Sequence, residues 1–129
     1  STTVDSVMTP AEEIVSVAKN DLLGPLVLNE LHKSGFHAFP VVRGTIDDVI
    51  GMVDITELLR VDAVQKSRTA EKAMMSVDVR VSPDAALPDV LEQLVDHPGQ
   101  FGLVVDGDKT IGLVTIGDVL SALLGKNHK

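Results

Sequence analysis

The hydrophobic positions in the first half of the chain follow two different spacings. Short apolar runs predict strands, and apolar residues that recur every three or four positions predict amphipathic helices. Gly35 follows the first helical stretch, where a left-handed cap favours glycine, and a polar turn around Gly44, Asp47 and Asp48 separates two apolar runs. The expected elements are a strand at 15–17, a helix at 26–34, strands at 39–42 and 49–53, and a helix at 55–64.

The second half of the chain predicts the same order of elements. Ser82-Pro83 is a favourable helix start, because proline suits the first helical position. Gly107-Asp108 predicts the turn of a hairpin. The charged stretch 62–69 is interpreted as the link between the halves. The expected elements are a strand at 79–81, a helix from 82 to about 96, strands at 101–106 and 110–114, and a last helix that ends before Gly125.

The two halves also match residue by residue. Residues 50–59 (IGMVDITELL) align with residues 111–120 (IGLVTIGDVL), and the order of the other elements is kept. Neither half is large enough to bury a sufficient core alone, so each is expected to pack against its twin. The fold class predicted is α/β (α+β), a tandem pair of β-α-β-β-α repeats related by a pseudo-two-fold axis, with repeat 1 at residues 1–66 and repeat 2 at residues 67–129.

The amino-acid composition excludes several classes of partner and chemistry. The chain has 11 Lys and Arg against 19 Asp and Glu, a net charge of −8, so it repels nucleic acids and anionic lipid surfaces. There are no cysteines, which excludes disulfides and thiolate chemistry and fits a cytoplasmic location. No signal peptide and no apolar run of about 18 residues is recognised, so no membrane span is predicted within the 129 residues.

The repeat carries a recognisable family pattern. The segment 112–118 (GLVTIGD), which opens the last helix of a doubled strand-helix-strand-strand-helix unit, resembles a pair of cystathionine-β-synthase (CBS) domains, or Bateman module. Segments 7–10 (VMTP), 34–41 (SGFHAFPV) and 48–51 (DVIG) resemble more narrowly the CBS pairs of CorC and hemolysin-C-like membrane proteins, which are linked to magnesium and cobalt efflux.

The resemblance implies a regulatory module rather than an enzyme, with an adenine nucleotide (AMP, ADP or ATP) in the cleft between repeats and Mg²⁺ as a companion of ATP. It also implies a homodimer, attached to a membrane domain on the cytoplasmic side. In the family pattern Thr115 and Asp118 hold phosphate and ribose, and Thr9 and residues before Pro-Val line the base pocket. The candidate nucleotide-binding residues are therefore Thr9, Phe36, His37, Ala38, Pro40, Thr115 and Asp118.

The chemistry of Thr115 and Asp118 allows two interpretations. A helix N-terminus offers unpaired N–H groups and a partial positive charge, which suit a phosphate, and the Asp carboxylate can accept from ribose hydroxyls. The same Thr-x-x-Asp spacing is close to a capping box, a purely structural device worth about 1 kcal/mol. Both interpretations can hold together.

The first repeat departs from this pattern. Asp54 and Glu57 stand where the second repeat has Thr115 and Asp118. A carboxylate at the phosphate position would repel the ligand by about 1–4 kcal/mol, depending on the local dielectric. We therefore expect one nucleotide per chain, on the side of Thr115.

A second departure concerns the phosphate end of the ligand. The related membrane proteins often carry Arg two residues before the Pro of Pro-Val, and here that position is Ala38, so a bidentate phosphate partner is missing. A triphosphate would then depend on Mg²⁺ or on another cation such as Arg43, Arg80 or Lys109. The loss also favours the alternative of a structural dimerisation module without a ligand.

The remaining aromatic and histidine positions carry weaker signals. Phe36 or Phe39 is expected to approach adenine while the other lies in the core. Pro40 is expected at a strand edge, because it cannot donate to a ladder. The four histidines (His32, His37, His97 and His128) show no metal-ligand spacing, so no metal site is predicted.

Overall fold

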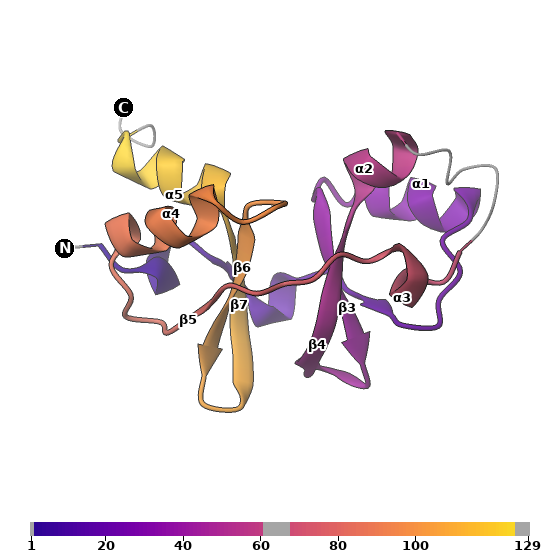
Figure 1. The fold of residues 1–129 in the computed structure, drawn as a ribbon, viewed down its shortest axis with the longest axis horizontal. Helices are drawn as coiled ribbons and strands as arrows, with labels where there is room; N and C mark the ends of the chain where they lie inside the picture. Colours follow the sequence, from indigo (N-terminus) through magenta and orange to yellow (C-terminus); the bar gives the residue numbers. More distant parts are fainter. Residues whose placement is uncertain (1, 61–67, 126–129) are drawn as a thin grey trace. The chain divides into compact units, whose positions relative to one another are not determined.

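The computed structural model describes residues 2–60 and 68–125, which form two compact units (Figure 1). We call them the central unit, from residues 15–76, and the terminal unit, from residues 1–14 and 77–129. Each unit contains one small sheet and its helices, so the α+β class predicted from the sequence is confirmed.

The central unit has a three-stranded sheet in the order β2-β3-β4. β2 is parallel to β3, and β3 and β4 form an antiparallel hairpin through Gly44, whose φ is +92°. Gly24 precedes the first helix, which starts at a proline whose missing N–H is not needed there. The elements are β2 (Val17–Ala18), α1 (Pro25–Lys33), β3 (Ala38–Arg43), β4 (Thr45–Asp54), α2 (Ile55–Arg60) and α3 (Ala70–Ala73).

The terminal unit has a four-stranded sheet in the order β1-β7-β6-β5. β6 and β7 form a hairpin closed by Gly107, whose φ of +63° suits glycine. The elements are the 3₁₀ turns η1 (Val4–Ser6) and η2 (Ala11–Glu13), the strands β1 (Thr9–Pro10), β5 (Arg80–Val81), β6 (Phe101–Asp106) and β7 (Lys109–Thr115), and the helices α4 (Leu87–Val95) and α5 (Ile116–Leu123).

Each unit has its own aliphatic core. In the central unit, Phe39, Val41 and Val53 are fully buried with residues of α1 and α2. In the terminal unit, Val104 and Val114 are fully buried with residues of α4 and α5, and the N-terminal Val4 joins the same cluster. The apolar periods of the sequence therefore mark the faces that pack.

The compact units do not contain the same segments as the repeats 1–66 and 67–129. β1, from the start of the chain, pairs with β7 near its end. In the same way Met75 exchanges backbone hydrogen bonds of 2.8 and 2.9 Å with Met52 in β4. Both pairings give hydrogen-bond partners to backbone groups of a hairpin strand that would otherwise lie at the edge of its sheet. Such unpaired edges favour the addition of another strand.

A glycine allows the close approach at each of these pairings. A Cβ on Gly112 would lie 2.2 Å from Met8 Sδ and 3.0 Å from the Thr9 carbonyl oxygen. A Cβ on Gly51 would lie 2.4 Å from Met74 Sδ and 2.9 Å from the Met75 carbonyl oxygen. The aligned glycines therefore share one role, which is to let a methionine and the backbone beside it lie against the strand.

We predict that Gly112→Ala lowers the free energy of unfolding by about 1–3 kcal/mol, because the Thr9 carbonyl cannot retract without loosening β1. Urea denaturation followed by far-ultraviolet circular dichroism measures it. Gly117→Ala is the control, since a Cβ there meets only Thr115 Oγ1, at 3.7 Å. Within a helix, Ala for Gly is neutral or stabilising by up to about 1 kcal/mol. Equal stability of the two variants would contradict the packing role of Gly112.

Some expected boundaries are wrong. The helix expected from Ser82-Pro83 begins at Leu87, because the carbonyls of Pro83 and Ala85 accept hydrogen bonds from the N–H groups of Asp5 and Val4. Asp47 and Asp48 lie inside β4 rather than in the turn, which consists of Gly44 alone between paired Arg43 and Thr45. The expected helix at 55–64 is described as far as Arg60, and its remainder and most of the link 62–69 lie outside the described residues.

Candidate functional site

Thr115 and Asp118 form a reciprocal capping box at the start of α5. The Asp118 N–H donates to Thr115 Oγ1 at 3.2 Å, and the Thr115 N–H donates to Asp118 Oδ2 at 3.0 Å. Both residues are half-buried. The structural interpretation of the Thr-x-x-Asp spacing is thus confirmed, and the question becomes which polar atoms the box leaves available.

Three polar groups at this end of α5 have no partner among the described residues. The Ile116 N–H donates to the Gln100 carbonyl at 3.0 Å, whereas the Gly117 N–H has no acceptor within the described chain. Thr115 Oγ1 accepts from the backbone, so its own proton can still be donated. Asp118 Oδ1 is likewise not engaged by a described donor. One N–H, one O–H and one carboxylate oxygen can therefore meet a phosphate and a sugar hydroxyl.

Thr9 lies close to this group. In the β1–β7 pair Thr9 is opposite Leu113, two residues before Thr115. Residues opposite each other in an antiparallel pair project from the same face, and so do residues two apart on one strand. Thr9 and Thr115 therefore share a face of the sheet, as diagonal neighbours about 7 Å apart. The terminal unit thus brings together three of the predicted site residues.

The other four predicted site residues belong to the central unit. Phe36 is partly buried against the core, and its N–H donates to Ser34 Oγ at 3.2 Å. His37 is exposed, and its carbonyl accepts the Ile55 N–H at 2.9 Å. Ala38 and Pro40 lie in β3 opposite Asp54 and Met52. Within the central unit, His37 and Ala38 therefore lie beside the start of α2. The role of all four residues toward a ligand stays a prediction.

Two expectations about this segment are resolved. Phe39 is fully buried in the core, and Phe36 precedes β3 instead of lying on it, so of these two rings Phe36 is the one that keeps exposed surface. The expected edge position of Pro40 is wrong, because β3 is the central strand of its sheet. The missing N–H of Pro40 costs no bond to β2, because β2 pairs only with residues 41 and 42. The aligned Leu103 donates its N–H to Val79 at 2.9 Å, a bond that proline cannot make.

The start of α2 differs chemically from the start of α5. Asp54 Oδ1 accepts from both the Thr56 N–H at 2.9 Å and the Glu57 N–H at 3.3 Å. The carboxylate of Glu57 is turned toward Arg60, with which it forms an ion pair. Since the Ile55 N–H is also bonded, the first turn of α2 offers no spare backbone N–H within the described residues. A carboxylate also occupies the capping position, so this helix end is unsuited to an anion.

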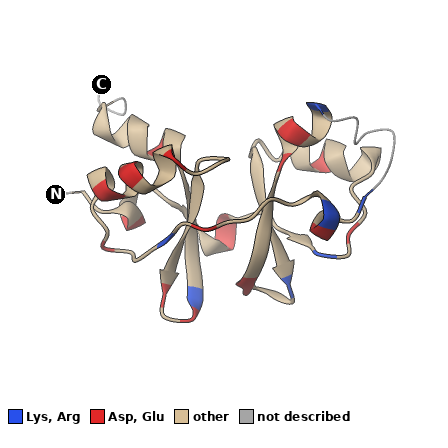
Figure 2. Ribbon diagram, in the orientation of Figure 1, with Lys and Arg blue, Asp and Glu red and all other residues tan. Residues whose placement is uncertain are grey.

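The cations named as substitutes for the missing arginine are engaged or distant. The pKa of the Arg43 guanidinium is raised above its ordinary value, because Asp48 accepts a hydrogen bond from it and pairs with it at 2.9 Å. Arg80 Nη1 donates to the Val77 carbonyl at 3.0 Å. Lys109 begins β7 and Thr115 ends it, which separates them by about 20 Å at the strand rise. Figure 2 shows Asp and Glu positions on the helices of both units.

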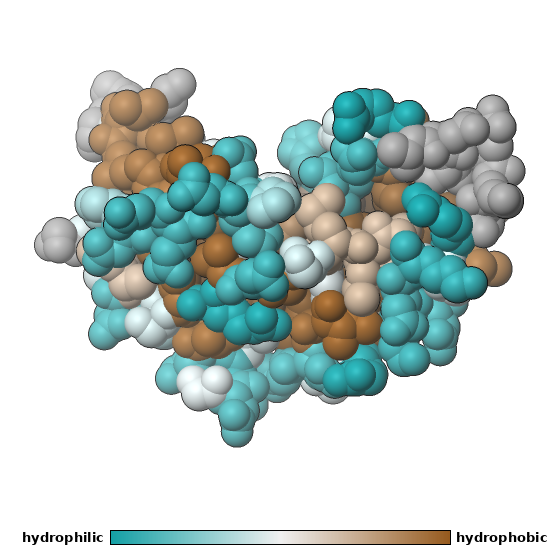
Figure 3. Space-filling view, viewed as in Figure 1, coloured by the Kyte–Doolittle hydropathy of each residue, from teal (hydrophilic) through white to brown (hydrophobic). Residues whose placement is uncertain are grey.

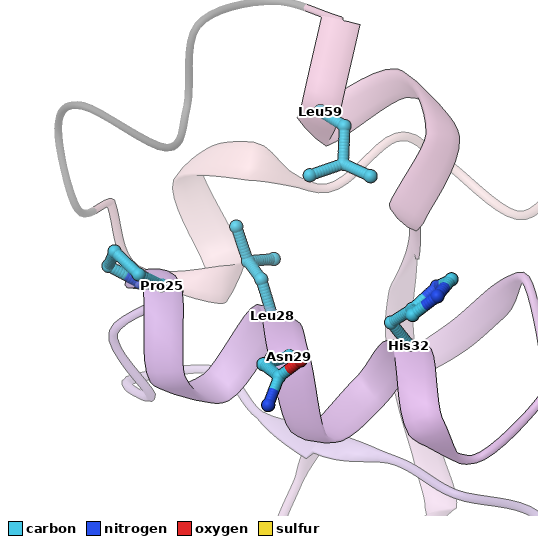
Figure 4. Close-up of a pocket in the computed structure, with 5 residues that line it drawn as sticks. All are labelled: Pro25, Leu28, Asn29, His32 and Leu59. Atoms are coloured by element: carbon cyan, nitrogen blue, oxygen red, sulfur yellow. The ribbon is translucent and has the colours of Figure 1, made fainter.

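A separate groove lies between α1 and α2 in the central unit (Figure 4). It has a volume of about 270 Å³ and is lined mainly by apolar atoms. Its lining residues are Pro25, Leu28, Asn29, His32 and Leu59. None of them is a predicted nucleotide-binding residue. Within residues 2–60 and 68–125, no group of three or more His, Asp or Glu side chains could hold a metal ion.

His97 is a buried polar residue that the sequence did not single out. Its Nε2 accepts from the Asp78 N–H at 3.2 Å, and its ring stands edge-on to Phe101 with centroids 5.4 Å apart. Its Nδ1 is buried without a hydrogen-bond partner in the described part of the chain. The ring fills the space beside the turn before β6. A histidine near Pro98-Gly99 gives no local signal of burial, because tertiary packing creates it.

Comparison with known proteins identifies the family. Two CBS domain matches cover residues 4–64 and 70–125, so the chain belongs to the CBS domain family as a pair of such domains. It is 30% identical to the UPF0053 protein MT1890 of Mycobacterium tuberculosis over 125 residues, which are 95% of this chain and 27% of that protein. It is also 30% identical to the UPF0053 inner membrane protein YfjD of Escherichia coli, over 95% of this chain and 29% of that protein.

The chain thus spans less than a third of these two relatives. The resemblance to hemolysin-C-like proteins expected from the sequence is confirmed, since hemolysin C of Rickettsia prowazekii is 28% identical over 95% of this chain and 41% of that protein. Among the helices of the described residues, none has the length and apolarity needed to cross a membrane.

Solved structures share the fold over nearly the whole chain. The CBS domain of a bacterial CNNM/CorC family Mg²⁺ transporter in complex with ATP superposes with a TM-score of 0.82 at 25% identity, covering 96% of this chain and 88% of that one. A CBS-domain pair with bound AMP from Klebsiella pneumoniae superposes with a TM-score of 0.78 at 26% identity, covering 97% of this chain and 100% of that one.

Proposed function

We propose that this chain is a regulatory module, without catalytic activity, that binds one adenine nucleotide at the start of α5. In this proposal the Thr115 hydroxyl and the Gly117 N–H donate to a phosphate, and Asp118 Oδ1 accepts from the ribose. Thr9 borders the same site, and Phe36, His37, Ala38 and Pro40 remain candidates for contact with the base. The single observation that carries the proposal is the difference between the two helix starts. Within the described residues, α5 keeps an unbonded Gly117 N–H beside a neutral hydroxyl cap, whereas the corresponding N–H groups of α2 are bonded to the Asp54 carboxylate.

The comparisons support the choice of ligand class. Two structural relatives of the same fold were solved with ATP and with AMP. Both ligands share adenosine and a first phosphate, which are the parts that Thr115 and Asp118 would contact. The further phosphates of ATP lack a bidentate arginine, because that position is Ala38, so ATP would require Mg²⁺ as its companion.

The surrounding protein is part of the proposal. The relatives are longer, and one of them is named an inner membrane protein. We place the module on the cytoplasmic side of a CorC- or hemolysin-like ion-transport membrane protein. A nucleotide there would favour one arrangement of the module over another only to the extent that it binds the two with different affinities.

A ligand-free dimerisation module is the second candidate. The helices of the terminal unit expose Val95, Leu120, Leu123 and Leu124, and Figure 3 shows apolar surface gathered at the α5 end of that unit. Exposed apolar patches of this kind mark interaction sites. A homodimer through this face is compatible with either candidate, so dimerisation alone does not separate them.

Calorimetric titration with AMP, ATP and MgATP tests the proposal. Wild type is expected to bind AMP at one site per chain, and Asp118→Ala to weaken AMP binding by about tenfold or more, because the ribose loses a charged acceptor. Asp54→Ala is the matched control, since it removes the cap of α2 and is expected to leave the affinity for AMP within about twofold of wild type.

The outcomes separate the candidates. If Asp118→Ala binds AMP as wild type does, the ligand is not held at α5. If wild type binds none of the three nucleotides, the dimerisation module is the better account. The chain has no Trp and no Tyr, so nucleotide retained during purification would dominate its near-ultraviolet absorbance and must be removed first.

A further inference from the structure

The first residues of the chain are an integral part of the terminal unit. Val4 is fully buried in its core. The Val4 N–H donates to the Ala85 carbonyl at 2.9 Å, and the Asp5 N–H donates to the Pro83 carbonyl at 3.1 Å. η1 is therefore tied to the segment before α4, and β1 continues from it to the edge of the sheet.

The Met8 side chain packs the β1 segment against the sheet. It is partly buried in the core of the terminal unit and lies over Gly112, where no other residue type would leave room for its sulfur. Thr9 follows directly, paired with Leu113. Thr9 and Thr115 are more than 100 residues apart in sequence, so Thr9 lies beside Thr115 only when the N-terminal segment is docked on the sheet.

We propose that Met8 is a positioning residue for the nucleotide site, and that docking of residues 2–14 on the terminal unit is coupled to nucleotide binding. The inference rests on the proposed function. The site can bind nucleotide only when Thr9 is in place. The apparent affinity of the chain is therefore the intrinsic affinity multiplied by the fraction of molecules in which β1 is docked. The coupling is reciprocal, so a bound nucleotide must hold β1 more firmly on β7.

The repeat supplies a matched control. Met74 lies over Gly51 as Met8 lies over Gly112, and Met75 bridges to Met52 as Thr9 pairs with Leu113. Met74 packs against β4, and β4 ends at Asp54 instead of Thr115. Met74→Ala and Met8→Ala therefore remove equivalent packing, but Met8 lies beside the strand that leads to the unbonded Gly117 N–H, and Met74 does not.

AMP titration of Met8→Ala, Met8→Leu and Met74→Ala tests the coupling. We expect Met8→Ala to weaken AMP binding about tenfold, within the usual range of coupling between sites. Met8→Leu is expected to restore binding to within about threefold of wild type, because leucine fills a similar volume. Met74→Ala is expected to bind AMP within about twofold of wild type while losing similar stability in urea.

Hydrogen exchange provides a second measurement on the wild-type chain, which avoids any variant that fails to fold. AMP is expected to slow amide exchange in residues 4–10 and to leave residues 74–77 unchanged. The coupling is overturned if Met8→Ala and Met74→Ala weaken AMP binding equally, or if saturating AMP leaves exchange in residues 4–10 unaltered. Absence of AMP binding by wild type would instead overturn the proposed function, and the coupling with it.

Discussion

Thr115→Asp is expected to weaken AMP binding by at least about tenfold while leaving the fold intact, for two reasons. A carboxylate at this position repels the phosphate by about 1–4 kcal/mol, depending on the local dielectric. It would also accept from the Gly117 N–H, as Asp54 Oδ1 accepts from the Thr56 N–H, and so remove the spare donor. Calorimetric titration with AMP measures the loss.

Thr115→Asp separates the role of residue 115 as a helix cap from its proposed role in binding the phosphate. Aspartate is as good an N-cap as threonine, so the free energy of unfolding is expected to change by no more than about 0.5 kcal/mol. Thr115→Ser is the control, because serine retains the hydroxyl and is expected to bind AMP within about threefold of wild type. Unchanged AMP binding by Thr115→Asp would mean that no phosphate lies at the start of α5.

Phe39→Ala is expected to lower the free energy of unfolding by about 3–5 kcal/mol, the largest loss of stability predicted for this chain. Phe39 is fully buried opposite Val53 at the centre of the core of the central unit, so its removal leaves a cavity. Since the chain has no Trp or Tyr, urea denaturation is best followed by far-ultraviolet circular dichroism.

Phe36→Ala is the matched control for this loss. Phe36 is only partly buried and lies outside the strand, so its removal is expected to cost about 1 kcal/mol of stability. In the proposed function Phe36 is the candidate ring for adenine, so its loss is expected to weaken AMP binding several-fold. Equal destabilisation by the two variants would contradict the division of the two rings between core and site.

The hairpins were predictable because their signals are local. Apolar runs on both sides of a glycine turn predict paired strands, and β6 has the bounds expected from the sequence. Gly35, Gly107 and Gly125 have positive φ where a helix end or a turn was expected. The aligned repeats also predicted equivalent elements in both halves. Backbone preference and hydrophobic period act within a few residues, so they can be inferred from the chain alone.

The misplaced start of α4 arose where distant segments compete for the same groups. Ser82-Pro83 carries a good helix signal, yet the residues around it accept hydrogen bonds from the N-terminal segment and stay extended. Thr115 and Asp118 were recognised as a cap and as a ligand site, but the sequence did not tell which of their atoms the cap would use. That allocation depends on hydrogen-bond geometry across the first turn of the helix.

The sequence by itself determined the doubled plan of strands and helices, because this plan follows from local preference and periodicity, and it indicated the class of protein through the resemblance of its motifs to those of CBS pairs. Only the tertiary structure decided that residues 2–14 complete the sheet of the second half and that Met8 and Met74 lie over glycines. It also decided that, of the two aligned helices, α5 keeps a spare backbone N–H in its described first turn and α2 does not. These features depend on contacts between segments far apart in the chain, whose energy no local pattern encodes.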